Sequence, residues 1–328
     1  MVPKKLKKGS NIRVCSPSRS LKIISQETRW VANNNLLQMG LNVSFSKLAE
    51  EMTDFVSSSI ESRVSDLNEA FSDKKVNGIL TTIGGFNSNQ LLNYINFKLI
   101  KKNPKIFCGY SDITALSNAI YAKTGMITYS GPHYSTMGMK NGNGYTIDHF
   151  KKCLFDKTPF EISPSVEWSD DSWWMDQEKR KYFANNGPEV IHEGKAKGTL
   201  IGGNLCTFIL LQGTEYMPSL KNSILFIEDD EAFGKLFDVM FDRNLQSILQ
   251  QDGADKIRGI IIGRPQKSID FNKEKIEKII NSKKELNNIP VISGVDFGHT
   301  TPLLTLPVGG TMRIEGLKNS TKLEVLKH

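Results

Sequence analysis

The stretch "IFCGYSDITALSNAI", residues 106–120, joins an apolar run to a helical pattern through a short polar turn. Ser111 stands at this junction. A serine there is either the N-cap of the following helix, whose first free amides its oxygen accepts, or an exposed nucleophile on a strand–turn–helix elbow. The local sequence supports both interpretations, so the remainder of the chain has to decide between them.

The first 135 residues repeat the same alternation of strand and helix. Strand-like segments cover 11–18, 42–46, 76–85, 105–110 and 126–132, and helical segments cover 26–39, 57–73, 88–95 and the stretch from Ser111 onward. Such alternation predicts crossover units and a doubly wound parallel sheet. Ligands bind such sheets outside the carboxyl ends of the strands. Gly84–Gly85 and Gly109–Ser111 lie at predicted strand ends of this kind.

The pattern changes after residue 135. Residues 136–197 are turn-rich and then polar and aromatic, which predicts a connector with a long loop, and long loops in compact proteins are commonly functional. Residues 198–328 mix strands and helices, and the two strand-like segments at their end predict a hairpin. The sequence therefore predicts an α/β protein with an N-terminal nucleophile domain (1–135), a connector (136–197) and a smaller C-terminal α+β domain (198–328).

Composition excludes several classes of protein. The chain has 328 residues and a net charge of +7, with lysine clusters typical of solvated ends and no zinc-finger or RNA-recognition signature, so nucleic acid is not expected as a partner. Its apolar runs are shorter than the roughly 18–20 residues that span a bilayer, and its basic N-terminus has no signal-peptide core. We expect a cytoplasmic protein with no membrane partner.

Metal and disulfide chemistry have no support in the sequence. The four cysteines are scattered without paired spacing, which is typical of small buried side chains in a reducing compartment. They are Cys15, Cys108, Cys153 and Cys206. Because metal-binding histidine motifs and nucleotide-phosphate loops are also absent, we expect neither a metal nor a cofactor.

A nucleophilic serine needs a base and usually a carboxylate that orients the base. His299, in "GVDFGHTTP", follows a buried strand, although a histidine that only bonds its turn is an equal alternative. His133 also follows a strand end, whereas His149 and His192 suit surface positions and His328 a frayed terminus. Glu228 ends the apolar run "SILFIE". The acidic residues after it are equally explained by the dipole of the next helix.

The glycine pair in "TTIGG" is the candidate oxyanion site. Glycines at a strand end let backbone amides approach a substrate closely, and the Gly85 and Asp112 amides would form such a hole. A simple tight turn explains the pair equally well.

Several segments together resemble the LD-carboxypeptidase family of serine peptidases, which includes murein tetrapeptide carboxypeptidases and microcin C self-immunity peptidases. They are "TTIGG", "GYSDITAL", "IGGNL" at 201–205, "LFIEDD" and "DFGHTTP", in the family's order along essentially the whole chain. The resemblance implies a triad of Ser111, Glu228 and His299, an oxyanion hole near Gly85 and Asp112, a site between two domains, and a homodimer.

The loop "SDDSWWMDQEKRKYFANNGPEV" is similar to the microcin C immunity branch, in which a tryptophan-bearing loop meets the nucleotide part of the substrate. Trp173 and Trp174 are then the stacking candidates, with Trp168 less favoured, because an indole face suits a purine. Packing of the loop is the alternative role. Arg243 is a candidate phosphate ligand, or it bridges to acidic neighbours such as Glu231.

The sequence thus predicts a serine peptidase or amidase that cleaves the amide between a peptidyl or aminoacyl group and a nucleotide. A murein tetrapeptide carboxypeptidase that releases D-alanine is the first alternative, because the same triad serves it. A non-catalytic ligand-binding protein on the same scaffold is the second, and a complete triad argues against it.

Overall fold

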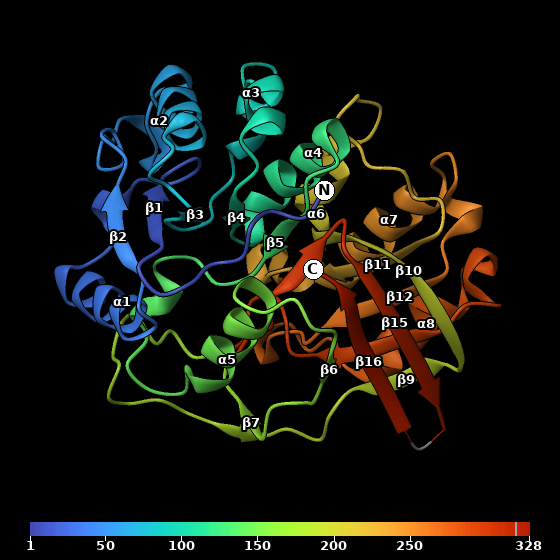
Figure 1. Cartoon of the computed structure of the whole chain (residues 1–328). Coiled ribbons are helices and arrows are strands. Elements are labelled where there is room, and N and C mark those ends of the chain that lie inside the picture. Colours follow the sequence, from blue (N-terminus) through green and yellow to red (C-terminus); the bar gives the residue numbers. More distant parts are fainter. Residues whose placement is uncertain (319) are drawn as a thin grey trace.

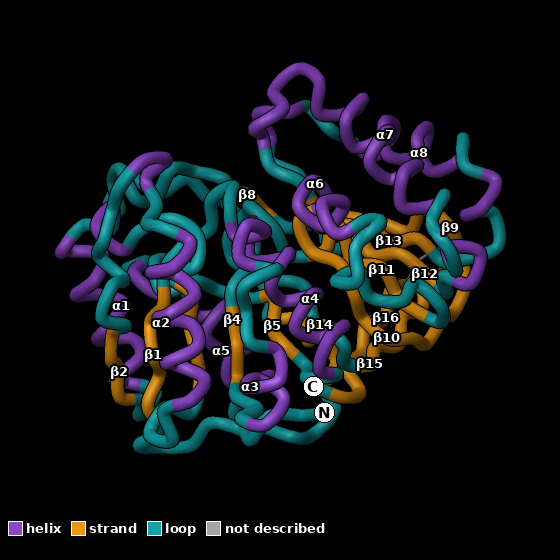
Figure 2. Tube along the Cα trace, turned by 90° about the horizontal axis from the view of Figure 1, so that it is seen from above, coloured by secondary structure: helices purple, strands orange, loops and turns teal. Residues whose placement is uncertain are grey.

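Two β-sheets lie side by side in the computed structural model, which describes residues 1–318 and 320–328, and helices cover both (Figure 1). Seen from above, the N-terminal sheet with α1 to α3 forms one lobe, and α7 and α8 lie together along one side of the C-terminal sheet (Figure 2). The α/β class and the division into an N-terminal parallel-sheet domain and a separate C-terminal domain are confirmed.

The N-terminal sheet has the strand order β14-β5-β4-β3-β1-β2, and its strands β1 to β5 pair in parallel. These strands are β1 (Asn11–Cys15), β2 (Asn42–Phe45), β3 (Gly78–Thr81), β4 (Ile106–Cys108) and β5 (Thr128–Ser130). The helices of this half are α1 (Gln26–Gln38), α2 (Ile60–Ser72), α3 (Phe97–Lys102), α4 (Thr114–Thr124) and α5 (Gly144–Leu154). The central strands β3 and β4 are buried throughout, as parallel strands usually are, whereas the edge strand β2 is partly exposed.

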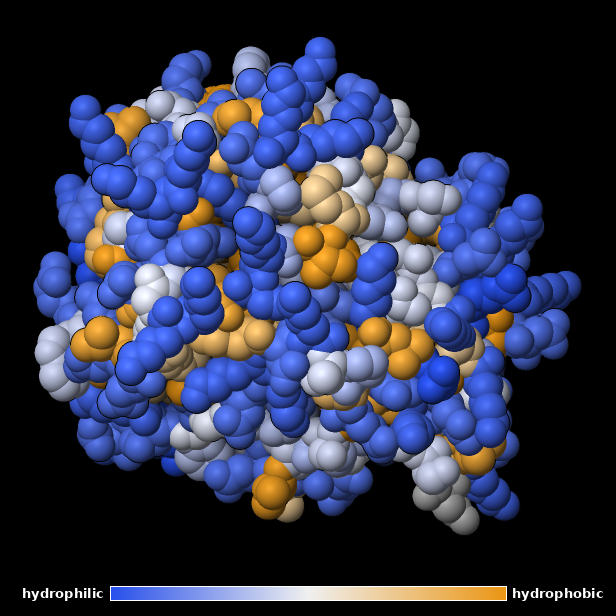
Figure 3. Space-filling model, in the orientation of Figure 1, coloured by the Kyte–Doolittle hydropathy of each residue, from blue (hydrophilic) through white to orange (hydrophobic). Residues whose placement is uncertain are grey.

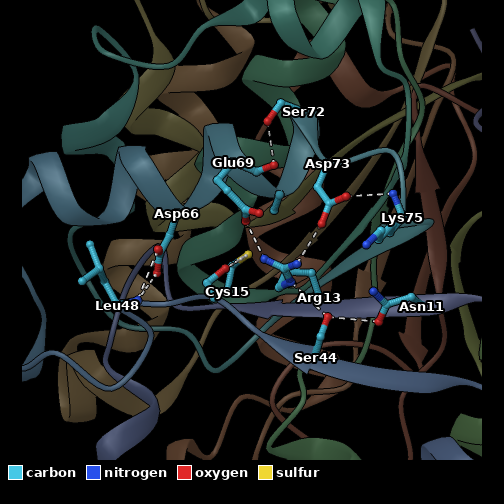
Figure 4. Close-up of polar contacts among 12 residues, drawn as sticks. Asn11, Arg13, Cys15, Ser44, Leu48, Asp66, Glu69, Ser72, Asp73 and Lys75 are labelled. Atoms are coloured by element: carbon cyan, nitrogen blue, oxygen red, sulfur yellow. Dashed lines mark hydrogen bonds and ion pairs between the residues drawn. The ribbon is translucent and has the colours of Figure 1, made fainter.

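Helix α2 shows how a helix of this half is fixed to the sheet. Its N-cap Ser59 accepts the Ser62 amide, and one apolar face enters the core. Arg13 on β1 reaches Glu69 at 2.5 Å and Asp73 at 3.1 Å (Figure 4). Ion pairs at a partly exposed edge contribute little, so the buried apolar face provides most of the stability.

The C-terminal sheet has the strand order β6-β16-β15-β10-β11-β12-β13-β9, with parallel strands at its centre and antiparallel strands at its edges. Its strands are β6 (Phe160–Ile162), β9 (Glu189–His192), β10 (Gly194–Asn204), β11 (Ser223–Glu228), β12 (Gly259–Gly263), β13 (Val291–Val295), β15 (Thr311–Leu317) and β16 (Ser320–Lys327). Helices α6 (Leu205–Phe208), α7 (Phe237–Leu249) and α8 (Lys273–Asn281) complete this half. The terminal hairpin is β15 and β16, which pair as antiparallel neighbours.

Short elements join these parts. The pair β7 (Glu167–Trp168) and β8 (Phe183–Ala184) closes the tryptophan-bearing loop. The 3₁₀ turns are η1 (Leu21–Ile23), η2 (Asp54–Val56), η3 (Ser88–Leu91), η4 (Ser111–Ile113), η5 (Thr136–Gly138), η6 (Ile209–Leu211), η7 (Glu231–Leu236), η8 (Ala254–Lys256), η9 (Lys267–Ile269) and η10 (Lys284–Leu286).

The chain exchanges strands between its two halves. β14 (Leu306–Val308) leaves the C-terminal half and pairs antiparallel with β5, while β6 and β9 come from residues 136–197 and join the C-terminal sheet. The segment that the sequence indicated as an irregular connector therefore contains helix α5, the edge strands β6 and β9, the pair β7 and β8, and the start of β10. Sequence patterning marks a strand but does not identify its partner when the pairing is non-local.

A close contact between α4 and β10 locks the two halves together. Asn118 Nδ2 donates to the Gly202 carbonyl at 2.8 Å, and the Asn204 amide donates to Thr114 Oγ1 at 3.0 Å. Gly203 has a φ of +134°, and a Cβ there would lie 2.4 Å from Thr114 Oγ1. Only glycine permits this approach.

The surface in the orientation of Figure 1 is largely hydrophilic, with apolar side chains in separate spots (Figure 3). Within the described residues, helices that are both long and apolar enough to cross a membrane are absent.

The sequence indicated a surface position for His149 and a frayed terminus for His328, and both expectations were wrong. His149 is buried, and His328 is buried at the joined termini, where its ring lies 2.8 Å from the Cys153 carbonyl and 2.8 Å from Lys5 Nζ.

Replacing Gly203 by alanine tests the contact between the halves. We expect Gly203→Ala to lower the free energy of unfolding by roughly 3 kcal/mol or more, because it adds both backbone strain and an overlap with Thr114. Gly213→Ala is the control, since Gly213 also has a positive φ (+71°) but has no atom near its Cβ position. It should cost about 1–2 kcal/mol. Equal losses in urea unfolding would contradict this account of the interface.

Candidate active site

Ser111 follows β4 after Gly109 and Tyr110 and has a strained backbone conformation. Its φ is +59°, a left-handed value that serine rarely adopts. The N-cap positions of η4 and α4 are occupied by Tyr110 and Ile113, and neither side chain makes a capping bond. Ser111 is therefore not the N-cap of this helix. Its geometry is that of a sharp elbow that presents a hydroxyl at the end of a strand.

The glycine turn after β3 lies directly against Ser111. A Cβ on Gly84 would stand 2.9 Å from Ser111 Cβ and 3.0 Å from its Oγ, so a larger residue does not fit there. The buried Asp112 carboxylate fixes this turn by accepting the amides of Asn87 (3.1 Å) and Ser88 (2.9 Å). The side chain of Asp112 is a positioning group that the sequence did not indicate.

The predicted oxyanion amides lie in this same region. Gly84 lines the cavity beside Ser111, whereas a Cβ on Gly85 would meet Ser18 and Arg19 instead. Asp112 follows the nucleophile directly at the first turn of the helix. The role of the Gly85 and Asp112 amides stays a prediction.

The two sheets bring His299 and Glu228 to Ser111. His299 Nε2 lies 3.0 Å from Ser111 Oγ, and His299 Nδ1 lies 2.7 Å from Glu228 Oε2. Glu228 is the last residue of β11, and His299 follows β13. Gly298, with a φ of +104°, lies so close to the carboxylate that a Cβ would be 2.7 Å from Glu228 Oε2. The three predicted residues thus form one hydrogen-bonded chain across the junction of the halves.

The electrostatics of this chain favour a charged imidazole. Burial disfavours the imidazolium, but the adjacent Glu228 and the nearby Asp230 and Asp229 outweigh it and raise the pKa of His299 to about 9. Asp230 Oδ2 lies 3.6 Å from His299 Nε2. Burial next to Glu228 also raises the pKa of Asp229, to about 7.

His133, the other histidine at a strand end, lies behind Tyr110. The two rings are 4.4 Å apart between centroids, and His133 Nδ1 lies 2.8 Å from Thr81 Oγ1. Burial, with a further contribution from the charge of His299, lowers the pKa of His133 to about 3. His133 is therefore a neutral part of the floor of the site.

A cavity of about 460 Å³ opens in front of Ser111 and His299, and both Trp173 and Trp174 line it. Trp173 is only 9% exposed, whereas Trp174 is 63% exposed, and their rings meet edge to face with centroids 6.0 Å apart. Trp168 lines a separate cavity with Arg264 and Lys267. One indole of the loop is thus largely packed and the other is exposed, and a stacking role for either stays a prediction.

Arg243 does not line the cavity with the tryptophans. It lies on the exposed side of α7.

Arg19, which follows β1 and lines the cavity, was not singled out from the sequence. Ligands bind outside the carboxyl ends of the strands, and Arg19 directly follows the predicted strand "NIRVCSPS", so its position would have marked it as a candidate. The described residues contain no group of three or more His, Cys, Asp or Glu side chains that could hold a metal ion.

A strained serine, a histidine and a buried carboxylate in hydrogen-bonded series, in a cavity at the carboxyl ends of parallel strands, define a serine-hydrolase type of site. The models of the LD-carboxypeptidase N-terminal and C-terminal domains match residues 12–131 and 197–314. The chain belongs to the LD-carboxypeptidase family of serine peptidases and is a hydrolase of the serine-peptidase type.

Curated relatives span the chain. YocD of Bacillus subtilis is named as a carboxypeptidase candidate. It is 52% identical to this chain over 329 residues, and the match covers 100% of both chains. The microcin C7 self-immunity protein MccF of Escherichia coli is 32% identical and covers 94% of this chain and 91% of its own. A candidate murein peptide carboxypeptidase of Bacillus subtilis is 28% identical, with 98% and 94% covered.

Solved structures agree closely with the fold. An MccF-like protein from Bacillus anthracis superposes with a TM-score of 0.99 at 53% identity, and 100% of both chains is covered. MccF in complex with glutamyl sulfamoyl guanosine superposes with a TM-score of 0.88 at 30% identity, covering 99% and 98%.

The raised pKa of His299 gives a testable pH dependence. A base must be neutral to take a proton, so its neutral fraction rises as the pH increases through about 9. Asp230→Asn removes a charge that favours the imidazolium while it keeps the cap on the Ala232 amide, so the pKa of His299 should fall. NMR titration of ¹³C-labelled histidines measures this directly, with His299→Gln to assign the signal. An unchanged or higher pKa in Asp230→Asn would contradict the analysis.

Proposed function

We propose that Ser111, His299 and Glu228 act as a catalytic triad that hydrolyses an amide bond. His299 Nε2, 3.0 Å from Ser111 Oγ, takes the hydroxyl proton as the oxygen attacks the carbonyl carbon. Glu228, 2.7 Å from Nδ1, holds the tautomer and stabilises the imidazolium. The protonated His299 then gives its proton to the leaving nitrogen, which departs as an amine.

The remaining steps use the same groups. The Gly85 and Asp112 amides stabilise the oxyanion, aided by the glycine turn that Asp112 holds against Ser111. Water, deprotonated by His299, then attacks the acyl-enzyme and restores Ser111. The strained φ of Ser111 supports this role, because such strain is typical of pre-organised nucleophiles.

Our preferred substrate is an aminoacyl or peptidyl nucleotide whose scissile amide joins the acyl group to the nucleotide. The observation that carries this proposal is that Trp173 and Trp174 line the same cavity as Ser111 and His299. Base–aromatic stacking contributes about 1–3 kcal/mol per base. The nucleoside ligand of the MccF complex, in a relative that shares the fold, supports the same assignment. Cleavage of such a compound would detoxify it, and a protein with this activity would confer resistance to microcin C-like antibiotics.

Release of D-alanine from a murein tetrapeptide is the alternative, supported by the candidate murein peptide carboxypeptidase among the relatives. The same triad serves both reactions, so the cavity has to discriminate between them. A purely ligand-binding role is less favoured, because binding alone does not require the Ser111–His299–Glu228 series. We further propose that the protein acts as a cytoplasmic homodimer, which sedimentation analysis of the purified chain would test.

A side-by-side hydrolysis assay tests the function. The purified protein receives an aminoacyl adenylate analogue with a peptide-like amide, or a murein tetrapeptide that ends in D-alanine, with Ser111→Ala as the blank. We expect cleavage of the first, and a loss of at least about 10³-fold in Ser111→Ala and His299→Ala with the fold retained. Cleavage of the tetrapeptide alone would assign the protein to cell-wall recycling. Full activity in either variant would exclude the triad.

The tryptophans give a more specific prediction. Trp173→Ala and Trp174→Ala should each raise KM for the nucleotide substrate about 5- to 150-fold, as loss of a stacked base would. They should leave a nucleotide-free peptide substrate nearly unchanged. Met175→Ala, an exposed apolar residue of the same loop outside the cavity lining, is the matched control. An equal loss on both substrates would reduce the two indoles to packing residues.

A further inference from the structure

We propose that Arg19 binds the anionic group carried by the leaving group of the substrate. Arg19 lies in the loop that follows β1, at the carboxyl edge of the N-terminal sheet. Its partly exposed side chain lines the same cavity as Ser111, His299 and the two tryptophans.

The side chain is held in place by the glycine turn. Arg19 Nε donates to the Gly84 carbonyl at 3.0 Å, and the Arg19 amide approaches the same oxygen at 3.4 Å. Gly84 is the residue packed against Ser111. The guanidinium is therefore anchored through one nitrogen to the turn beside the nucleophile.

The remaining two nitrogens of this guanidinium have no protein partner among the described residues, and no carboxylate there lies within ion-pair distance of Arg19. An arginine keeps its charge at any physiological pH. A planar guanidinium with two free nitrogens matches the oxygen pairs of carboxylates and phosphoryl groups. The free edge of Arg19 thus has the chemistry of an anion ligand.

Apart from the imidazole of His299, whose pKa is raised, Arg19 is the charged side chain of the described cavity lining. Among its described lining residues, Arg19 is the one lysine or arginine, and none is an aspartate or glutamate. Glu228 and Asp230 contact His299 but do not line this cavity. Burial raises the pKa of Tyr110 and lowers the pKa of His133, and the positive charge of Arg19 makes a smaller, lowering contribution to each. Its field therefore reaches the floor of the site.

The position in the cavity indicates which part of the substrate meets Arg19. The inference rests on the proposed function in one respect, namely that the leaving group occupies the cavity lined by Trp173 and Trp174. In an aminoacyl nucleotide, a phosphoryl group lies between the base and the scissile amide. In a murein tetrapeptide, the leaving D-alanine carries a carboxylate. Both leaving groups present anionic oxygens close to the cleaved bond, so Arg19 fits either source.

Binding to Ser111→Ala protein tests this without turnover. Two ligand pairs are compared by calorimetry: AMP with adenosine, and a murein tetrapeptide with its C-terminal amide. Each pair differs in the anionic group alone. Arg19→Gln is the test variant, and Arg19→Lys retains the charge without the fork. Lys22→Gln, an exposed lysine of the neighbouring turn outside the cavity lining, removes the same charge and is the control.

We expect the parent protein to prefer the anionic member of at least one pair, and Arg19→Gln to reduce that preference about 10- to 100-fold, as loss of a charged hydrogen-bond pair would. Arg19→Lys should retain part of the preference and Lys22→Gln nearly all of it. The ligand pair whose preference falls shows whether Arg19 binds a phosphoryl group or a carboxylate.

The proposal is overturned if the parent protein prefers the anionic member of neither pair, or if its preference is unchanged in Arg19→Gln. A general shift of the glycine turn would weaken both members of a pair equally. Because these measurements need no hydrolysis, they separate failure of the Arg19 proposal from failure of the proposed reaction.

Discussion

The left-handed backbone of Ser111 is the constraint on which the site depends. Such a conformation costs an L-residue roughly 1–2 kcal/mol, and the surroundings offset it. Gly84 leaves room for the serine side chain, the Asp112 carboxylate ties the glycine turn to the same helix start, and α4 is buried along most of its length. The strained backbone, fixed by these neighbours, holds the Ser111 hydroxyl in one position, 3.0 Å from His299 Nε2.

The partners of Ser111 come from the other sheet, so the geometry of the site is a property of the contact between the halves. Glu228 ends β11 and His299 follows β13, while α4 is fixed against β10 by Asn118 and Gly203. The exchanged strand β14 adds a second connection. A shift of one sheet against the other would lengthen the distance between Ser111 and His299. The stability of the contact between the two halves therefore affects the geometry of the active site.

The sequence predicted the local features well and the non-local ones poorly. Strands β1 to β5, the terminal hairpin and the residues Ser111, Glu228 and His299 follow from apolar runs, strand ends and the resemblance to a family. The partners of β6, β9 and β14 did not, because pairing across distant segments leaves no local signal. Arg19 was overlooked although its position just after a predicted strand end marks it. The Asp112 side chain left no such signal, because its contacts to the glycine turn arise only from folding. The burial of His149 and His328 likewise depends on tertiary packing rather than on neighbouring residues.

The central claim is that Ser111 is a nucleophile activated by His299. Reaction of the purified protein with a small fluorophosphonate, followed by mass-spectrometric mapping of the adduct, tests it most directly. The account predicts one adduct on Ser111, formed faster as the pH rises through the raised pKa of His299 and strongly slowed in His299→Ala. An adduct on another serine, or an equal rate in His299→Ala, would contradict it.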